Sequence, residues 1–289
     1  MSSREEPAAP VGTGQIPDYE TYDFASVWRG RGIADAAERA IVRMWALPGG
    51  GSALDLGGGF GRITGVLEAL YKNVFMVDYS RRNLNAAVTR LRKTTTLVRC
   101  ELEALPFEDN AFDFISLIRV MHHIAEPRRL LAEVARVGRD GGTFAMSDPS
   151  VVTQRLLKRG EKNGPGGCVG VGPQGHLIYA TRLEQYDDPS LVREEIRGVG
   201  WFDNKIGVRL QRLGPLSSVD VATSKLWPAK TNLFLRFRVS KNGTHSPANA
   251  PAVVCVCGGT IAQGKCVRCG RQYGRVFDLA AARSSGPGK

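Results

Sequence analysis

Residues Leu54-Asp55-Leu56-Gly57-Gly58-Gly59-Phe60-Gly61-Arg62 form the stretch that decides the fold. An apolar run, Ser52–Leu54, leads into it and an amphipathic run, Ile63–Leu70, leads out, which predicts a strand, a tight glycine loop and a helix. Glycine is needed where a loop adopts positive φ or lies against a ligand. Ligands of open α/β sheets bind at the carboxyl ends of the strands. We therefore expect a ligand site at this loop.

The spacing within the loop separates two classes of ligand. Dinucleotide sites use G-x-G-x-x-G and place a pyrophosphate at the helix N-terminus, whereas this loop reads D-x-G-x-G-x-G from Asp55 through Gly57, Gly59 and Gly61. A carboxylate at the start of the loop repels a pyrophosphate but can pair with an ammonium group. The loop resembles motif I of the class I S-adenosylmethionine (SAM) methyltransferases, type 11-like. In that family it packs on the methionine part of SAM.

Two later segments extend the resemblance. The apolar run Asn73–Asp78 predicts a buried parallel strand whose terminal acid can accept hydrogen bonds from a ribose diol. Residues 101–113, ELEALPFEDNAFD, resemble the family segment D-x-E-x-L-P-F-x-x-x-x-F-D, in which the first acid bonds the adenine amino group. The resemblance implies a cofactor-binding set: Asp55, Gly57, Gly59, Gly61, Asp78, Tyr79, Glu101, Leu102, Ile118 and Arg119.

The segment Arg119–Ile124 resembles the part of the family that covers the SAM sulfonium and faces the methyl acceptor. His122 or His123 is a candidate general base, because imidazole titrates near neutral pH. The alternative is that one histidine is packed and the other ends the strand, since methyl transfer can proceed by proximity and alignment alone. We expect the glycine-rich residues 160–175 to form a loop over the acceptor, with His176, Tyr179 and Tyr186 beside it.

Four of the six cysteines lie in two pairs near the end of the sequence, Cys255 with Cys257 and Cys266 with Cys269, each followed by glycine. This pattern predicts a tetrahedral thiolate site for structural Zn²⁺. It resembles a zinc ribbon, notably that of the tRNA-methyltransferase activator family. The first pair is C-x-C rather than C-x-x-C, which leaves open a three-cysteine or lost site, an iron–sulfur cluster or a redox pair.

The chain of 289 residues has room for one large domain and a small one. We expect a disordered tail over 1–18, a methyltransferase domain over 19–240, a linker over 241–251, the zinc ribbon over 252–280 and a disordered tail over 281–289. The fold class predicted is α/β, with a Rossmann-like seven-stranded sheet and helices on both faces. The predicted helices cover 33–44, 81–93, 128–137 and 191–200; the predicted strands cover 73–78, 96–100, 112–118, 205–213 and 232–240.

Charge and hydropathy constrain the partners. Residues 151–289 carry 21 Lys and Arg against 9 Asp and Glu, whereas residues 1–150 carry 18 against 19. This basic half can attract RNA or phospholipid headgroups, or it can simply keep the surface solvated. The sequence contains no run of about 18 apolar residues and no secretory h-region, so we expect a cytoplasmic protein without a membrane span. The sequence does not indicate an oligomeric state.

We therefore predict a SAM-dependent methyltransferase that acts on a small-molecule acceptor by in-line transfer. An RNA methyltransferase that docks through the basic half and the ribbon is the alternative. Two other classes remain. A nicotinamide-dependent oxidoreductase shares the acid at Asp78 but is disfavoured by the loop spacing, and a non-catalytic nucleic-acid or partner-binding module is disfavoured by the intact cofactor residues.

Overall fold

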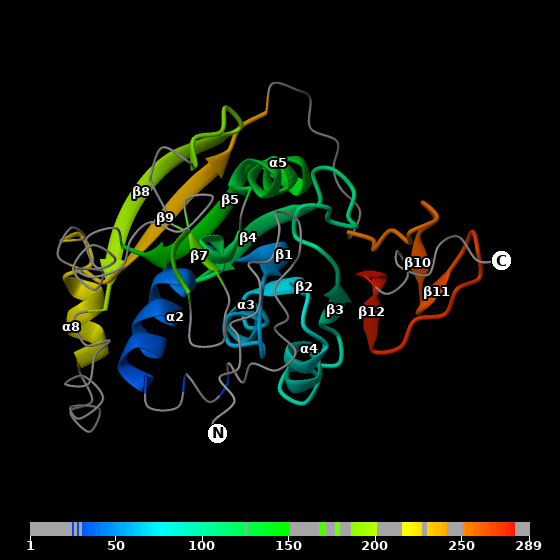
Figure 1. Cartoon of the computed structure of the whole chain (residues 1–289), viewed down its shortest axis with the longest axis horizontal. Coiled ribbons are helices and arrows are strands. Elements are labelled where there is room, and N and C mark those ends of the chain that lie inside the picture. Colours follow the sequence, from blue (N-terminus) through cyan, green and yellow to red (C-terminus); the bar gives the residue numbers. More distant parts are fainter. Residues whose placement is uncertain are drawn as a thin grey trace, which may run out of the picture.

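The protein is an α/β fold built on one large mixed sheet (Figure 1). The computed structural model describes residues 25, 28, 31–124, 126–150, 168–171, 177–179, 186–200, 216–226, 230–241 and 251–280. Its helices are α2 Gly32–Ala46, α3 Thr64–Leu67, α4 Arg81–Val88, η1 Met121–His123, α5 Pro127–Val137 and α8 Leu216–Ala222. Its strands are β1 Gly50–Leu56, β2 Tyr71–Asp78, β3 Thr96–Arg99, β4 Phe112–Ile118, β5 Gly138–Pro149, β6 Cys168–Val171, β7 Leu177–Tyr179, β8 Leu191–Val199, β9 Asn232–Val239, β10 Ile261–Ala262, β11 Lys265–Cys266 and β12 Val276–Asp278.

The large sheet has eight strands in the order β12-β3-β2-β1-β4-β5-β9-β8. The first six of these run parallel, and β9 runs antiparallel to its two neighbours, β5 and β8. The strand order reverses between β1 and β4, so the carboxyl ends of these two strands form the switch point at which such sheets bind ligands. The predicted Rossmann-like fold class is confirmed, and the glycine loop follows β1 at this edge.

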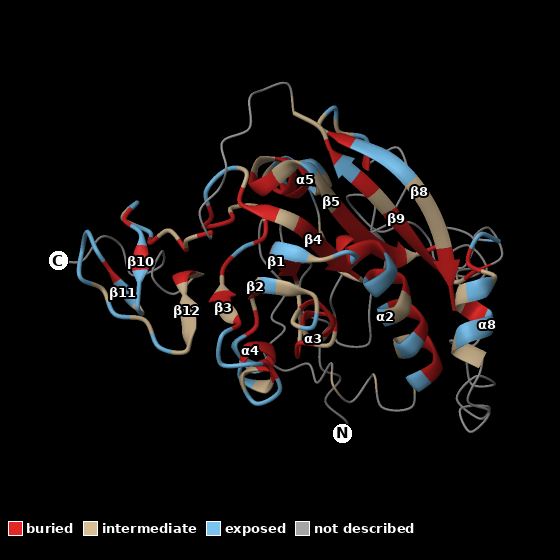
Figure 2. Cartoon of the chain, turned by 180° about the vertical axis from the view of Figure 1, so that it is seen from behind, coloured by how far each residue is buried: buried red, intermediate tan, exposed pale blue. Residues whose placement is uncertain are grey.

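Much of the large sheet is buried (Figure 2). Successive side chains of a strand point to opposite faces of the sheet. On β2, Phe75 and Val77 join the cluster that contains the apolar side of α5, whereas Val74 packs with α2 and Met76 with α4. Helices therefore cover both faces, which is why the parallel strands read as continuous apolar runs.

One prediction about the later elements is wrong. Residues 191–200 were predicted as the helix before the last two strands, but Leu191–Val199 is the edge strand β8. Its charged side chains pair across to β9, where Arg238 Nε donates to Glu194 Oε1 at 3.0 Å. Charge of this kind is how edge strands avoid further pairing. The strand predicted over 205–213, the tails and the 160–175 loop lie largely or wholly outside the described residues.

The sheet has one strand more than predicted, because β12 comes from the cysteine-rich segment and pairs in parallel with β3 (Figure 1). The Asp278 carboxylate accepts from Arg81 at 2.8 Å and from Arg99 at 3.3 Å. Val254 N also donates to Pro106 O at 2.8 Å. Val253, Cys255 and Leu279 belong to the same buried cluster as the α5 face of the sheet. No helix among the described residues is long and apolar enough to cross a membrane.

Candidate functional site

Asp55 lies near the carboxyl end of β1 and is fully buried. Its two carboxylate oxygens accept hydrogen bonds from Thr64 Oγ1 at 2.6 Å and Ser116 Oγ at 2.7 Å. Burial raises the pKa of Asp55 to about 6, against the effect of these two hydroxyl donors and of the nearby Arg62. Asp55 therefore ties the start of α3 to β4 beneath the glycine loop.

The conformation of the glycine loop depends on its left-handed glycines and on a hydrogen bond to Asp78. Gly57, Gly59 and Gly61 all have positive φ, at 63°, 58° and 86°. A Cβ on Gly59 would meet no atom within 4 Å, so there is unfilled space over the centre of the loop. Asp78, the last residue of β2, accepts from Gly59 N at 2.8 Å and from Ser80 N at 2.8 Å. The structure thus brings the predicted loop and the predicted ribose acid into direct contact.

The predicted adenine side follows at the ends of β2 and β3. The guanidinium of Arg99 lies 4.7 Å from the centre of the Tyr79 ring, and its Nε donates to Tyr79 O at 2.6 Å. Glu101 is exposed just beyond β3, and Leu102 is buried beside it. These residues share the sheet edge with Asp78, because β2 and β3 are adjacent and parallel.

Arg119 follows β4 in the left-handed region, with φ of 60°. Its guanidinium pairs with the fully buried Glu38 of α2 at 2.5 Å, and Arg62 from the glycine loop pairs with the same carboxylate at 2.7 Å. The ring of Trp28 lies 3.7 Å from the Arg62 guanidinium and 5.1 Å from that of Arg119. One buried acid therefore joins α2 to the loop and to the end of β4, and Trp28 packs on the two arginines.

The two candidate histidines lie in η1, directly after Arg119. His122 Nδ1 is 2.5 Å from Asp148 Oδ1, and the other oxygen of Asp148 accepts from Tyr186 Oη at 3.2 Å. The His122 and His123 rings are 3.9 Å apart between centroids. His122 therefore has a carboxylate partner that orients its ring.

Three residues of this edge gave little signal in the sequence. Glu38 is one of the polar residues between the apolar positions of the predicted helix, and Asp148 was not singled out. Tyr186 was predicted only as a possible acceptor contact. A pairing between residues 81 positions apart, as for Arg119 and Glu38, leaves no local pattern to find.

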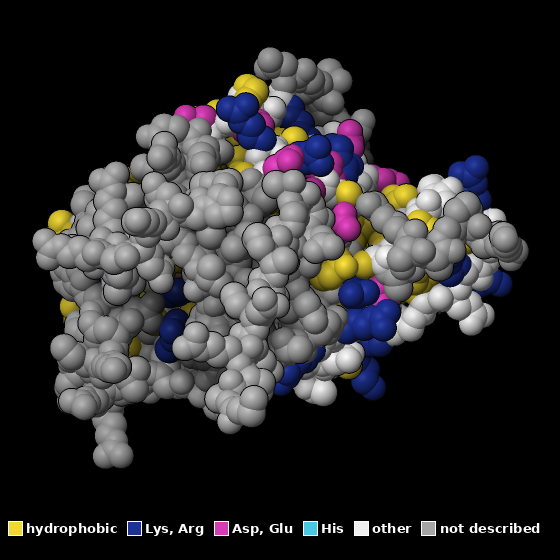
Figure 3. All heavy atoms as spheres, viewed as in Figure 1, with side chains coloured by type: hydrophobic (Ala, Val, Ile, Leu, Met, Phe, Trp, Pro, Cys, Tyr) yellow, Lys and Arg dark blue, Asp and Glu magenta, His cyan; other side chains and the backbone are white. Residues whose placement is uncertain are grey.

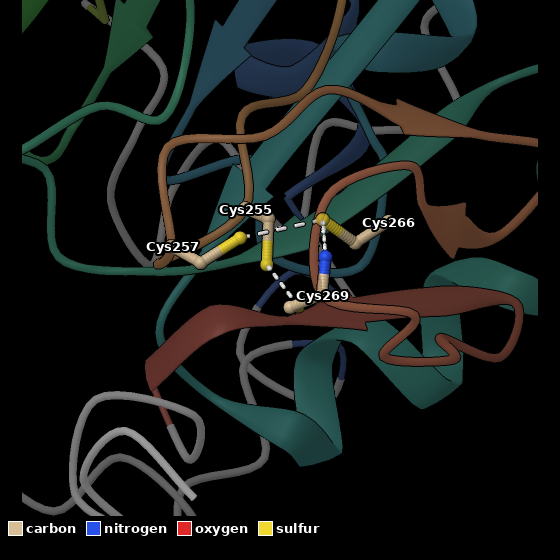
Figure 4. Close-up of side chains that lie close together, drawn as sticks. All are labelled: Cys255, Cys257, Cys266 and Cys269. Carbon is tan, nitrogen blue, oxygen red and sulfur yellow. Dashed lines mark hydrogen bonds between the residues drawn. The ribbon is translucent and has the colours of Figure 1, made fainter.

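The four cysteines predicted as metal ligands converge from two loops (Figure 4). Their sulfurs all lie within 4.8 Å of one another, with Cys255 to Cys269 at 3.7 Å and Cys257 to Cys266 at 3.4 Å. Four sulfurs at a bond length of about 2.3 Å from a tetrahedral ion would be roughly 3.8 Å apart, so this donor set fits zinc.

The shortened first pair still forms a knuckle. Gly258 N donates to Cys255 O at 2.8 Å, and Gly270 N donates to Cys266 O at 3.0 Å. Both glycines have positive φ, at 80° and 73°, immediately after the second cysteine of their pairs. The C-x-C pair therefore closes its turn one residue earlier than the C-x-x-C pair, and both pairs direct sulfurs to one point.

Comparison with known proteins finds one family model that matches part of the large sheet. A family model described as a methyltransferase domain matches residues 54–146. The chain is 30% identical to a demethylmenaquinone methyltransferase of Clavibacter sepedonicus over 42% of this chain and 50% of that protein. It is 25% identical to a demethylmenaquinone methyltransferase of Renibacterium salmoninarum over 70% of this chain and 87% of that protein.

An uncharacterized protein of a Streptomyces fradiae transposon is 37% identical over 35% of this chain and 30% of its own length. The chain thus spans half or less of the length of some curated relatives, including this protein and the Clavibacter one.

Solved structures resemble the chain over most of its length. A Haloferax volcanii complex of the Trm112 methyltransferase activator and a putative methyltransferase contains a chain that aligns with a TM-score of 0.55, covering 76% of this chain and 97% of that one at 17% identity. A SAM-dependent methyltransferase of Mesorhizobium loti aligns with a TM-score of 0.53, covering 71% and 99% at 18% identity. At these identities the likeness concerns the fold.

Proposed function

Because this chain contains a methyltransferase domain, matched over residues 54–146, we propose that it binds SAM and transfers the methyl group to a small molecule. The observation that carries the proposal is the shared edge of β1, β2 and β4, where the glycine loop, Asp78 and the histidines lie together. Two of the relatives are named demethylmenaquinone methyltransferases, which supports a small-molecule acceptor.

The residues at this edge fit SAM by their chemistry. The space over Gly59 suits a ligand lying against backbone, and Asp78 beside it suits hydroxyl donors of a ribose. Tyr79, Glu101 and Leu102 are proposed to contact the adenine, and Ile118 and Arg119 the region of the reacting sulfur. Asp55 lies beneath the loop, and we propose that it stabilises the loop through its hydrogen bonds with Thr64 and Ser116.

SAM, when bound, supplies a methyl group on a positively charged sulfur, which an acceptor atom can attack in line. The contribution of the protein is alignment of the acceptor and exclusion of water. His122 or His123 in η1 is proposed to receive a proton where the acceptor must release one. Arg119 is held in position by Glu38, which fixes the backbone that leads into η1.

Transfer of label from methyl-tritiated SAM tests the activity, with demethylmenaquinone in its reduced form as one acceptor and total RNA as another. We expect label in the demethylmenaquinone fraction or in another small-molecule fraction of a cell extract. Label that disappears on ribonuclease treatment would instead support an RNA acceptor. An absence of label in every fraction, with no binding of SAM by calorimetry, would contradict the proposal.

Asp78→Ala is the variant that tests the cofactor site. We expect affinity for S-adenosylhomocysteine to fall at least about tenfold, because a hydrogen bond to a charged group contributes roughly 1.5–3 kcal/mol. Asp109→Ala is the matched control, because Asp109 is an exposed acid paired with Arg136 away from the loop. Unchanged affinity in a folded Asp78→Ala protein would remove Asp78 from the site.

One observation favours RNA as a second acceptor class. Residues 81–99 contain six Lys and Arg and no acid. Pairing of β12 with β3 brings the cysteine-rich segment, with Lys265, Arg268, Arg271 and Arg275, to the same end of the sheet. Figure 3 shows Lys and Arg side chains gathered over this part of the surface. A basic surface of this kind attracts phosphate backbones without regard to sequence.

We propose that Cys255, Cys257, Cys266 and Cys269 hold one structural Zn²⁺. All four sulfurs converge, which supports a closed site with no position left for a substrate. The metal would supply folding energy to a segment too short to bury a core of its own. Four reduced thiolates also suit a reducing compartment such as the cytoplasm.

A further inference from the structure

Three largely buried side chains from separate segments meet beside the proposed reaction site. His122 comes from η1 after β4, Asp148 from the end of β5, and Tyr186 from the segment before β8. The side chains of His122 and Asp148 are 12% and 5% exposed, and Tyr186 is 2% exposed. The backbone of β7 also lies beside η1. The group is therefore nearly closed to solvent and sits at the switch-point edge.

The contact with Asp148 favours a proton on Nδ1 of His122. An ionised carboxylate only accepts, so His122 Nδ1, 2.5 Å from Asp148 Oδ1, is the donor in this contact. In the neutral ring Nε2 is then the nitrogen with the free lone pair. The same oxygen also accepts from His122 N at 3.3 Å, and Oδ2 accepts from Tyr186 at 3.2 Å. With both oxygens engaged, Asp148 cannot rotate away from the ring.

This arrangement has the features of an oriented base. A buried carboxylate costs free energy unless it is hydrogen-bonded, and here its donors include an imidazole next to the proposed reaction site. In histidine-based catalysis the acid behind the ring holds the tautomer and stabilises the imidazolium that forms when the ring takes a proton. A histidine needed only for packing would not require a buried acid aligned on one nitrogen.

We propose that Asp148 is a positioning residue that holds His122 as the general base of methyl transfer, and that the acceptor attacks through an atom that must lose a proton. This inference rests on the proposed function and deepens it. The acceptor class is a hydroxyl compound, such as a phenol or hydroquinone, or a carbon acid activated by such a group. Tertiary amines and thioethers have no proton to release and fall outside the class.

The step balances in atoms and charge. The electron pair of the acceptor atom forms the new bond to the methyl carbon, and the carbon–sulfur bond breaks with its pair left on sulfur. The proton of the acceptor passes to His122 Nε2 and from there to water. Asp148 stays ionised and faces the charged ring, and Tyr186 keeps the second oxygen of Asp148 in place.

Nitrogen-15 NMR of the full chain tests the orientation without any acceptor. The chain has four histidines, and His122→Asn identifies the His122 signals. We expect the neutral His122 ring of the wild type to carry its proton on Nδ1, and Asp148→Asn to shift it toward the other tautomer. A wild-type ring protonated on Nε2, or one unaffected by Asp148→Asn, would overturn the inference.

Kinetics with reduced demethylmenaquinone and with a panel of phenols tests the role. We expect His122→Asn and Asp148→Asn each to lower kcat about 100-fold or more, the usual size of a general-base contribution. The KM for the acceptor and the affinity for S-adenosylhomocysteine should stay within about twofold, and imidazole should restore part of the activity of His122→Ala. Asp140→Asn is the control, since Asp140 is on the same strand but accepts from Lys241 N.

The outcomes separate the two proposals. If the wild type fails to bind S-adenosylhomocysteine, the proposed function fails. If it binds and methylates but the two variants keep their kcat, or lose it only in proportion to cofactor affinity, Asp148 and His122 are structural and only this inference fails. Efficient methylation of a tertiary amine or thioether, in preference to the hydroxyl compounds, would also overturn it.

Discussion

At the scale of single residues, the carboxylate of Asp55 is unusual. Asp55 is the first residue of the glycine-loop pattern, and its side chain is buried beneath that loop. Its pKa is raised from 3.8 to about 6 by burial. The folded protein therefore binds a proton at Asp55 more tightly than the unfolded chain does. The stability contributed by this group is gained as the pH falls from about 6 to about 4 and is lost as the pH rises through that window.

Asp55→Asn tests this linkage. The neutral amide has no charge to desolvate, so the part of the pH dependence that belongs to Asp55, about 3 kcal/mol at most, should disappear. Urea unfolding between pH 4.5 and 8 measures it: the variant should gain stability relative to the wild type as the pH rises. Asp109→Asn, at an exposed site, should track the wild type. If the pH dependence of stability were the same for Asp55→Asn and the wild type, the pKa of Asp55 would not be raised by folding.

At the scale of elements, the glycines in and after the loop differ in what an added Cβ atom would contact. A Cβ on Gly57 would lie 2.5 Å from Val120, whereas Cβ atoms on Gly59 and Gly65 would meet nothing within 4 Å. Gly59 has positive φ and Gly65 lies in α3. The three positions therefore separate steric clash, backbone strain and ordinary helix propensity.

We expect Gly57→Ala to lower the free energy of unfolding by at least about 2 kcal/mol, from the clash with Val120 and the left-handed backbone together. Gly59→Ala should lower the free energy of unfolding by only about 1–2 kcal/mol. It should also weaken the binding of S-adenosylhomocysteine, because the added methyl group enters the space proposed for the ligand. Gly65→Ala, the control, should be neutral or stabilising by up to about 1 kcal/mol. Full cofactor affinity in Gly59→Ala would place the ligand elsewhere.

The sequence predicted the first half of the sheet well because its signals are local. Ser80 caps α4 through Asn83 N, and β4 spans the predicted residues 112–118. The edge strands were harder. Leu191–Val199 mixes charged and apolar residues in a way that also suits a helix, and only its pairing with β9 decides the matter. The His122–Asp148 contact and the Glu38 pairs depend on tertiary packing that no short pattern records.

At the scale of the whole molecule, the cysteine cluster and the catalytic sheet are joined through β12. Arg275 donates to Thr95 O at 2.5 Å and to Arg92 O at 2.8 Å, and Asp278 pairs with Arg81 and Arg99. Loss of the metal should therefore loosen more than the knuckles themselves, because the strand beyond them covers one edge of the sheet.

Metal removal tests this connection. We expect the purified protein to hold one zinc per chain by elemental analysis, and a chelator used with a thiol reagent to release it and lower Tm. Cys257→Ser and Cys269→Ser should lose the metal, whereas Cys100→Ala, at a buried thiol outside the cluster, should keep it. A metal-free protein that melts at the same temperature as the zinc form would show that the cluster does not support the sheet.

The position of β12 in the chain has a consequence during synthesis. Arg99 of β3 and Asp278 of β12 are separated by 179 residues. At about 5–20 residues per second, β3 leaves the ribosome on the order of 10–40 s before its partner exists. Throughout that interval the nascent chain presents an uncovered parallel edge, the kind of surface that recruits other strands. Translation speed, chaperone access and the zinc supply at the moment of completion would then together set the yield of folded protein.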